Sequence, residues 1–304
     1  MIREARKEDK QDVYALWKLA YPSHSRNYLN FYFKNHFDKG TCIIAEQDNR
    51  IISSLQMNEH VMRICGKKLN VSYILGVSTL PDYRRRGHMK TLMDSAIDEA
   101  SHNHLVTLIK AFNPKLYERF GFETLYYHKF YTIPKEELKN VSTSHISYTA
   151  DAEELVKVYQ QFVSHFDGYY IRNQEYYSSL LNEMVINQKQ MVVYRNRRNE
   201  VTGYLIYQFK KEGVHVDEAI YLESVVLTRM LKAALGKADE ITVEVSNSEK
   251  LEKIFPMIIA KRQPAMMVRV NNLPLFNNLY NTDAKTSKEA FSIMKKPLWC
   301  HEYY

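Results

Sequence analysis

The chain has 304 residues, enough for about two domains, and its 45% apolar and 25% charged residues, with only 9 Gly and 8 Pro, exclude a disordered chain. The net charge of +7 comes from basic residues that are scattered except at 84–86 and 196–199, so we do not expect a nucleic-acid-binding stripe. No apolar run approaches the roughly 20 residues of a membrane span and no secretory signal is evident, so we expect a cytoplasmic protein that does not enter membranes.

The first part of the chain predicts a strand, a helix and a meander of three strands. Residues 1–4 predict the first strand, and apolar residues at helical spacing over 13–20, ended by Pro22, predict the helix. Turn signals at Asp48-Asn49 and Gly66-Lys67 separate three further predicted strands, at 41–47, 49–64 and 67–80. The aromatic segment 28–37 is expected either to pack in the core or to line a substrate cleft.

A basic loop after Pro81 leads into a predicted helix with apolar residues at helical spacing from Met89 to Ala100. The pattern then predicts a buried strand, a short helix that Gly121 stops and another strand, at 105–112, 115–120 and 122–133. Strands and helices mixed in this order predict an α/β fold. The polar segment 134–147 is interpreted as a linker.

The second part of the chain repeats this order. Helices are predicted at 152–166 and 173–184, then a hairpin over 191–210 with its turn at 197–200, a helix at 223–236 and a strand at 241–246. This similarity predicts an internal repeat of one fold.

The strongest local signal is the segment VSTLPDYRRRGHM at 77–89, in which a strand runs into a basic turn that opens a helix. Such a turn directs backbone N–H groups and the positive end of a helix dipole to one place, which is how proteins hold a pyrophosphate. Gly87 lets the backbone approach a ligand closely. The alternative is a solvated basic turn.

This segment resembles the acetyl-coenzyme A loop R/Q-x-x-G-x-G/A of the GNAT superfamily of N-acetyltransferases, with Arg84 and Gly87 at the motif positions. Met89 replaces the small residue usual at its position, and the run GVSTLPDYRRRGHMKTLM is similar to the enhanced intracellular survival (Eis) group, in which a larger residue stands there. The resemblance implies tandem GNAT folds, each with a mixed, mostly antiparallel sheet flanked by helices. It also implies acetyl-CoA as cosubstrate, held by Val77, Ser78, Thr79, Arg84, Arg85, Arg86, Gly87, His88, Met89 and Asn113.

The segment LIKAFNPKLYERFGFE is similar to a second motif of the same group, and Tyr117 matches the residue near the thioester sulfur. A phenol with a pKa of about 10 can donate a proton to a leaving thiolate, so the resemblance makes Tyr117 the general acid. The alternative is a tyrosine that packs at the end of a short helix.

A general base is less evident, because residues 70–80 contain no Asp, Glu or His, and Glu59 and His60 are the nearest candidates. In the resembled group the chain's own C-terminal carboxylate reaches the catalytic centre, which implies a catalytic role for Tyr304 in anchoring the amine or relaying a proton. The alternative is an aromatic tail docked for stability. His102 and His104 are expected to be solvated at a helix end.

No metal site is expected, because the three cysteines (Cys42, Cys65 and Cys300) are widely separated and lack zinc-binding spacing. The predicted helix at 224–235 has no glycine or basic turn before it, so the second repeat is expected to be degenerate, to wall the cleft of the first and to leave one coenzyme site per chain. Residues 266–304 resemble a shortened sterol-carrier-like domain. The expected domains are therefore a catalytic GNAT domain at 1–135, a degenerate one at 141–265 and this short segment with the tail.

The expected function is transfer of an acetyl group from acetyl-CoA to a primary amine by direct attack. Members of the resembled family act on aminoglycosides and protein lysines, which leaves an aminoglycoside-like small molecule and a protein lysine as candidate acceptors. The alternative is a non-catalytic acyl-CoA-binding regulatory or interaction module. Homo-oligomer formation stays open.

Overall fold

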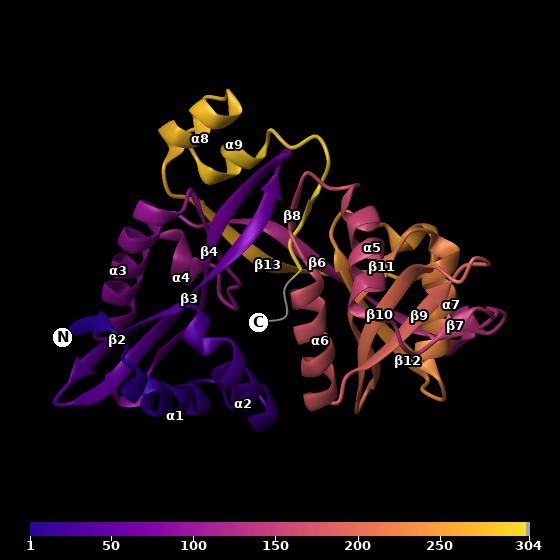
Figure 1. Ribbon diagram of the computed structural model, residues 1–304, viewed down its shortest axis with the longest axis horizontal. Coiled ribbons are helices and arrows are strands. Elements are labelled where there is room, and N and C mark those ends of the chain that lie inside the picture. Colours follow the sequence, from indigo (N-terminus) through magenta and orange to yellow (C-terminus); the bar gives the residue numbers. More distant parts are fainter. Residues whose placement is uncertain (302–304) are drawn as a thin grey trace. The chain divides into compact units, whose positions relative to one another are not determined.

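The computed structural model describes residues 1–301, which form two compact units (Figure 1). Unit 1 comprises residues 1–125 and 264–294, and unit 2 comprises residues 126–263 and 295–301. Among the described residues, none of the helices combines the length and apolarity that a membrane span requires.

Unit 1 contains a six-stranded sheet in the order β1-β2-β3-β4-β5-β13. Strands β4 and β5 are parallel, and their neighbours pair antiparallel. Its elements are β1 (Ile2–Glu4), α1 (Lys10–Ala20), α2 (Arg26–Asn35), β2 (Thr41–Gln47), β3 (Arg50–Ile64), β4 (Lys67–Thr79), α3 (His88–Asn103), β5 (Val106–Ile109), α4 (Lys115–Glu118), β13 (Lys261–Val270), α8 (Leu273–Tyr280) and α9 (Ser287–Phe291).

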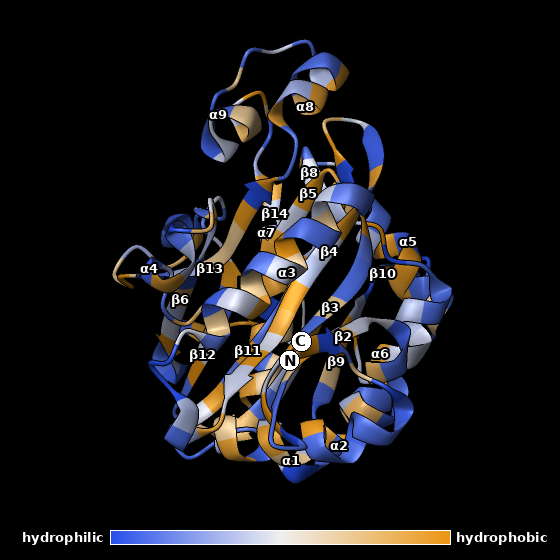
Figure 2. Ribbon diagram, turned by 90° about the vertical axis from the view of Figure 1, so that its left-hand side faces the viewer, coloured by the Kyte–Doolittle hydropathy of each residue, from blue (hydrophilic) through white to orange (hydrophobic). Residues whose placement is uncertain are grey.

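Tight turns connect the strands of this sheet, and helices pack their apolar faces against it. Asp48 and Asn49 both have positive φ, at 51° and 56°, as a two-residue hairpin turn requires. The next turn is centred on Cys65 and Gly66, one residue earlier than predicted. Helix α1 buries Trp17, and α3 buries an apolar face (Leu92, Met93, Ala96 and Ala100) as it lies along the strands (Figure 2).

Unit 2 contains a sheet in the order β7-β9-β10-β11-β12-β6, in which β11 and β12 are the parallel pair. Its elements are β6 (Glu123–Pro134), β7 (Ile146–Ser147), α5 (Ala152–Val163), β8 (Gly168–Tyr170), α6 (Gln174–Ile186), β9 (Gln190–Arg195), β10 (Val201–Lys210), β11 (Gly213–Tyr221), α7 (Ser224–Leu235), β12 (Glu240–Ser246) and β14 (Leu298–Trp299).

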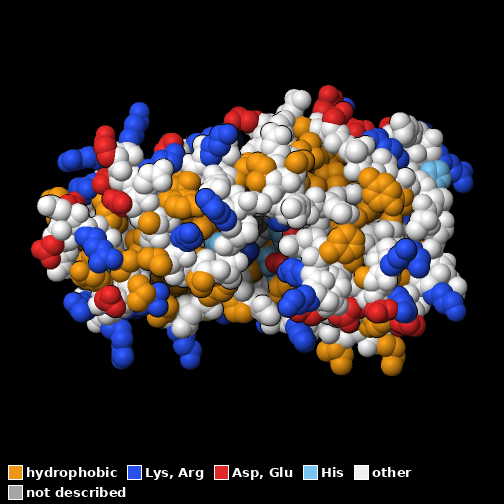
Figure 3. Space-filling model, turned by 90° about the horizontal axis from the view of Figure 1, so that it is seen from below, with side chains coloured by type: hydrophobic (Ala, Val, Ile, Leu, Met, Phe, Trp, Pro, Cys, Tyr) orange, Lys and Arg blue, Asp and Glu red, His pale blue; other side chains and the backbone are white. Residues whose placement is uncertain are grey.

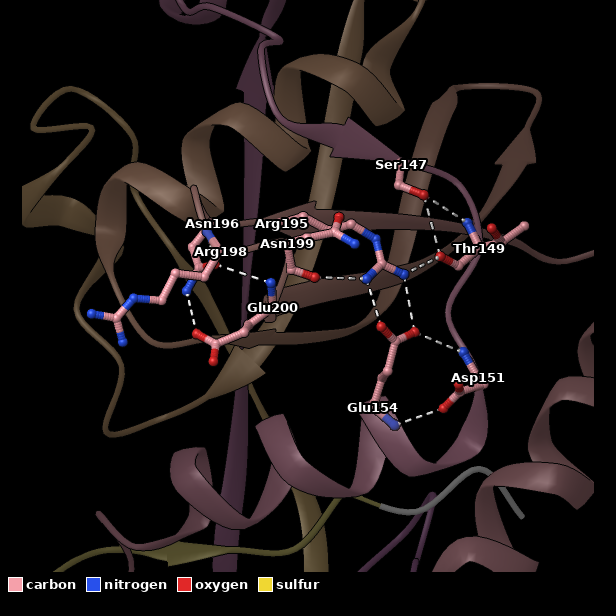
Figure 4. A network of polar contacts seen from close by, with 9 residues as sticks. All are labelled: Ser147, Thr149, Asp151, Glu154, Arg195, Asn196, Arg198, Asn199 and Glu200. Atoms are coloured by element: carbon pink, nitrogen blue, oxygen red, sulfur yellow. Dashed lines mark hydrogen bonds and ion pairs between the residues drawn. The ribbon is translucent and has the colours of Figure 1, made fainter.

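The hairpin of β9 and β10 turns where the sequence predicted (Figure 4). The Asn196 side-chain oxygen accepts hydrogen bonds from the backbone N–H groups of Arg198 and Glu200 at 2.9 and 3.0 Å. Arg195 ties the hairpin to α5 through two contacts with the Glu154 carboxylate, at 2.5 and 3.0 Å. Glu154 also completes a capping box with Asp151, so the turn and the helix start stabilise each other.

The internal repeat is visible in the element order, because each unit has a short strand, two helices, three antiparallel strands, a helix and a parallel strand. The last strand of each sheet, however, comes from the other repeat. Strand β6, which follows the first repeat, pairs with β12. Strand β13, which follows the second repeat, pairs with β5. Each unit therefore needs sequence from both halves of the chain.

Residues 28–37 lie mostly in helix α2, whose Tyr32 is buried and stacks on Trp17 with ring centroids 5.1 Å apart, as the core alternative for this segment expects. Two other segments differ from the sequence interpretation. The predicted linker contains Leu138, which is fully buried in the core of unit 2. Strand β11 was not predicted, because Glu218 occupies one of its inward positions and interrupts the apolar alternation.

Candidate active site and family

A bulge in β4 shapes the start of the candidate site. The register between β3 and β4 shifts between Ser54 and Gln56, which leaves Gly76 and Val77 in a bulge. Gly76 has φ of +62°, and a Cβ there would lie 1.8 Å from the Trp17 ring, so only glycine fits. The bulge is therefore fixed by packing as well as by backbone conformation.

Beyond the bulge, β4 runs on without its parallel neighbour. Strand β5 pairs with β4 only opposite residues 72–74 and ends at Ile109, whereas β4 continues to Thr79. Backbone groups on this side of β4 are thus outside the described β4–β5 ladder. An extended ligand could bind to such groups, because unpaired backbone N–H and C=O groups need partners.

The predicted residues in this part of β4 already have hydrogen-bond partners within unit 1. The Ser78 hydroxyl is buried and lies 2.8 Å from the Ser54 hydroxyl. The carbonyl oxygen of Thr79 accepts a hydrogen bond from Arg84 Nε at 3.2 Å, and that of Val77 accepts one from the Tyr21 hydroxyl at 2.7 Å. The Ser78 carbonyl also accepts a hydrogen bond, from the Ser53 hydroxyl at 2.6 Å, so the oxygen atoms of these residues already have partners within the protein.

The loop after β4 ends at the N-terminus of α3, which is open to an anion. Gly87 is the N-cap residue with φ of 87° and ψ of −6°, and it makes no side-chain cap. The first intrahelical N–H among these residues is that of Thr91, which donates to the Gly87 carbonyl at 3.1 Å. The amides before it point out of the helix end, where the dipole favours negative charge.

The turn before α3 and the first residues of the helix carry basic side chains. Residues 84–91 include Arg84, Arg85 and Arg86 and contain no Asp or Glu, and the three arginines are exposed. Arg86 lies over the Tyr83 ring at 5.4 Å, and the His88 ring lies 6.3 Å from the same ring. Met89 is partly buried against the core, so the first turn of α3 is anchored by packing.

Tyr117 lies on the short helix α4 and is half-buried, with its ring 6.5 Å from that of Phe122. Burial raises the pKa of the Tyr117 phenol above its ordinary value, so the group is protonated at neutral pH. Burial also raises the pKa of Tyr21, with a smaller contribution from Tyr117. Tyr117 therefore interacts electrostatically with Tyr21. The Tyr21 hydroxyl in turn donates a hydrogen bond to the carbonyl of Val77 in the β4 bulge.

Asn113 is exposed and lies at the start of α4, where its carbonyl accepts the Leu116 N–H at 3.2 Å. The sequence interpretation missed Tyr21 and Gly76. An isolated glycine inside a strand pattern is a signal for a bulge and could have indicated Gly76. Tyr21 carried no such signal, because nothing local indicates its bond to Val77.

The candidate bases are largely committed to other contacts. Glu59 lies 2.8 Å from His104 Nε2, and the other nitrogen of His104 lies 2.8 Å from the Ser72 hydroxyl. His104 is therefore a paired, partly buried residue and not the solvated one that was expected, whereas His102 is exposed. Tyr304 lies outside the described residues.

The corresponding helix end in unit 2 has different chemistry. The N-cap of α7 is Glu223, which has an extended backbone conformation. A carboxylate at this position opposes the approach of a phosphate, and the segment 219–223 before α7 contains no glycine or arginine. Only α3 thus has the basic, glycine-containing entry among these two matched helices.

Comparison with known proteins agrees with this architecture. Two family models, both described as acetyltransferase (GNAT) domain, match residues 1–125 and 168–270. A conserved protein from Enterococcus faecalis V583, described as a probable N-acyltransferase, aligns with a TM-score of 0.78 and 18% identity over 90% of this chain and 72% of its own. Eis1 from Mycobacterium abscessus aligns with a TM-score of 0.68 and 15% identity over 91% and 75%.

No curated protein sequence matches the chain. The structural likenesses, at these identities, establish the fold, and the family models together cover most of the sequence. The predicted repeat is confirmed, since both halves match the same kind of domain. The chain belongs to the GNAT family of acetyltransferases, with two GNAT domains in tandem.

Proposed function

We propose that this protein transfers the acetyl group of acetyl-CoA to a primary amine by direct attack, at a site in unit 1. The observation that carries the proposal is the N-terminus of α3, where a left-handed Gly87 directly follows three exposed arginines. A diphosphate fits such a helix end, because main-chain amides and the helix dipole both favour negative charge.

The backbone amides of residues 85–89 would hold the pyrophosphate, with Arg84 beside it. Val77, Ser78 and Thr79 would align the acyl end through backbone N–H groups, since their carbonyl or hydroxyl oxygens already have internal partners. Asn113, exposed before α4, would contact the same ligand. Acetyl-CoA, when bound, supplies an activated thioester, and alignment of this ester with an amine would provide most of the rate.

Tyr117 would donate the proton that the departing sulfur needs. Its raised pKa supports this role, because a general acid must still carry its proton at the working pH. Its electrostatic interaction with Tyr21, whose hydroxyl donates a hydrogen bond to the Val77 carbonyl, supports a position near residues 77–79.

The Tyr304 carboxylate would anchor the amine or relay its proton through water. Among the described residues, Glu59 is already paired with His104, which makes it a poor alternative base.

The acceptor would be an aminoglycoside-like small molecule or a protein lysine. Figure 3 shows basic side chains spread among acidic and apolar ones on the face it presents, which supports a small anionic ligand more than a nucleic acid.

We further propose that residues 1–135 carry the catalytic GNAT sequence, that 141–265 are a degenerate copy without a coenzyme site, and that 266–304 include a shortened sterol-carrier-like segment. The Glu223 N-cap of α7 supports one coenzyme site per chain. A cytoplasmic location and homo-oligomer formation are part of the same proposal.

The experiment is release of free thiol from acetyl-CoA in the presence of a panel of aminoglycosides, polyamines and lysine peptides. Amine-dependent release, with the acetylated amine identified by mass spectrometry, is expected. Binding of acetyl-CoA without release for any amine would favour the alternative, a non-catalytic acyl-CoA-binding module. Tyr117→Phe serves as the matched control, since it should bind acetyl-CoA as tightly as the parent chain and release thiol more slowly.

A further inference from the structure

Three potential metal-binding side chains meet inside unit 2, far from one another in sequence. His128 lies on β6, Glu244 on β12, and His301 follows β14. Each offers one ligand atom, and these atoms all lie within 4.8 Å of one another. His128 and His301 are only 4% and 6% exposed, and the Glu244 side chain is 16% exposed. We call these three residues the His-Glu-His cluster.

The sheet register brings the first two together. His128 stands opposite Ser246 in the antiparallel β6–β12 pair, so His128 and Glu244 are diagonal neighbours on one face. His128 Nδ1 contacts a carboxylate oxygen of Glu244. Its other ring nitrogen, Nε2, is buried and has no hydrogen-bond partner among the described residues.

His301 is fixed in place by its own backbone. Arg172, fully buried, donates a hydrogen bond of 2.6 Å to the His301 carbonyl and another of 2.8 Å to Glu218. The His301 ring stacks on Trp299 at 5.6 Å and lies 5.0 Å from the His128 ring. The third member of the cluster is therefore held by packing and hydrogen bonds before any ligand arrives.

We propose that the His-Glu-His cluster binds one divalent transition-metal ion of the zinc class. Two imidazoles and one carboxylate form a donor set that zinc accepts, whereas calcium and magnesium prefer oxygen donors only. Donors at zinc distances of about 2.0–2.2 Å stand about 3.3 Å apart in a tetrahedral shell, so pairs that lie within 4.8 Å need to close by about 1.5 Å at most. A bound ion would give the unpaired His128 nitrogen a partner, which a buried polar atom normally has.

The competing interpretation is a buried ion pair with no metal. His215 Nε2 lies 3.8 Å from the second Glu244 oxygen and 3.6 Å from an Asp217 oxygen, so the Glu244 carboxylate already has a second imidazole beside it. That arrangement gives the Glu244 carboxylate its partners but leaves the buried His128 Nε2 without a hydrogen-bond partner among the described residues. The ion would join β6, β12 and the segment after β14, and the proposal does not depend on acetyl transfer.

The test uses the full chain, stripped with a chelator and dialysed against zinc chloride, with bound metal measured by mass spectrometry. One zinc per chain is expected, and Co²⁺ in its place should give the visible absorption of a low-coordinate nitrogen and oxygen site. His128→Gln and Glu244→Gln should each weaken zinc binding by at least about tenfold. His165→Gln, which changes an exposed histidine outside the cluster, should bind as the parent chain does.

Zinc should also raise the midpoint of thermal unfolding of the parent chain by several degrees and leave those of the two cluster variants unchanged. If Glu244→Gln fails to fold, His301→Gln carries the test, because His301 lies outside the helices and strands. Zinc binding below one-tenth of an equivalent, or binding that persists equally in the cluster variants as an adventitious ion only, would overturn the proposal.

Discussion

Replacement of Gly87 by alanine tests the candidate phosphate loop with a single added carbon. Gly87 has φ of +87°, and a Cβ built on it meets no heavy atom within 4 Å. The added methyl therefore has room within the protein itself. It would project from the helix end at which a pyrophosphate is proposed to bind, and the variant separates backbone strain from loss of ligand contact.

The structure provides a matched control in Gly66. It lies in the turn before β4, has φ of +82°, and likewise has nothing within 4 Å of a built Cβ. A residue with a Cβ costs about 1–2 kcal/mol in the left-handed conformation. Gly87→Ala and Gly66→Ala should therefore lower the free energy of unfolding by similar amounts, through strain alone.

Only Gly87→Ala should weaken coenzyme binding. Hydrogen bonds to charged groups contribute about 1.5–3 kcal/mol each, so misplacing one amide at the phosphate should raise the Kd for coenzyme A by about 10- to 100-fold. Calorimetric titration and urea unfolding of the two variants provide the measurements. Equal coenzyme affinity in the two variants, at equal loss of stability, would refute the argument that Gly87 serves close approach to a diphosphate.

Tyr117, the C-terminus, Glu249 and strand β13 each allow a further test. Tyr117→Phe should lower kcat by about 100-fold with little change in the KM for acetyl-CoA, and an unchanged kcat would remove the proton-donor role. Because burial raises the pKa of this phenol, the parent's activity should not fall at high pH within the range where an ordinary tyrosine titrates. A C-terminal tag beyond Tyr304 should reduce turnover sharply, and equal rates for tagged and untagged chains would exclude the carboxylate. Burial raises the pKa of Glu249 to about 7, against opposing hydrogen bonds from Tyr221 and Ser246, so the folded state holds this proton more tightly than the unfolded state and stability should fall as pH rises from about 4.5 to 7. Glu249→Gln should reduce the loss of unfolding free energy between pH 4.5 and 7 by about 1–2 kcal/mol, after allowance for partial exposure. Urea unfolding at several pH values measures this, and an unchanged pH dependence in the variant would contradict the prediction. A fragment of residues 1–135 lacks β13, whose Met266, Met267 and Val268 are almost fully buried, and should show no cooperative unfolding by circular dichroism; a stable fragment would show that β5 needs no such partner.

The sequence predicted the elements whose determinants are local. The strand at 41–47 has the observed bounds, because an apolar run is bounded by turn residues on both sides. The α3 entry was also predictable, since a strand, a basic glycine turn and an amphipathic helix follow one another directly. The repeat followed from the order of such elements along the two halves.

Features that depend on contacts between residues far apart in the chain could not be predicted from the sequence. The exchange of β6 and β13 between repeats leaves no local trace, because both strands have ordinary apolar patterns. The inward Glu218 of β11 makes sense only beside Arg172. The His-Glu-His cluster combines residues from three separated segments, whereas a sequence indicates metal ligands chiefly where they are closely spaced, as in paired cysteines.

The central claim is that the basic entry to α3 holds the diphosphate of one coenzyme molecule, and that the Glu223 entry to α7 holds none. Calorimetric titration of the intact chain with coenzyme A tests both parts together. The account predicts a single binding site per chain. Two equivalent sites, or no binding at millimolar coenzyme A, would contradict it.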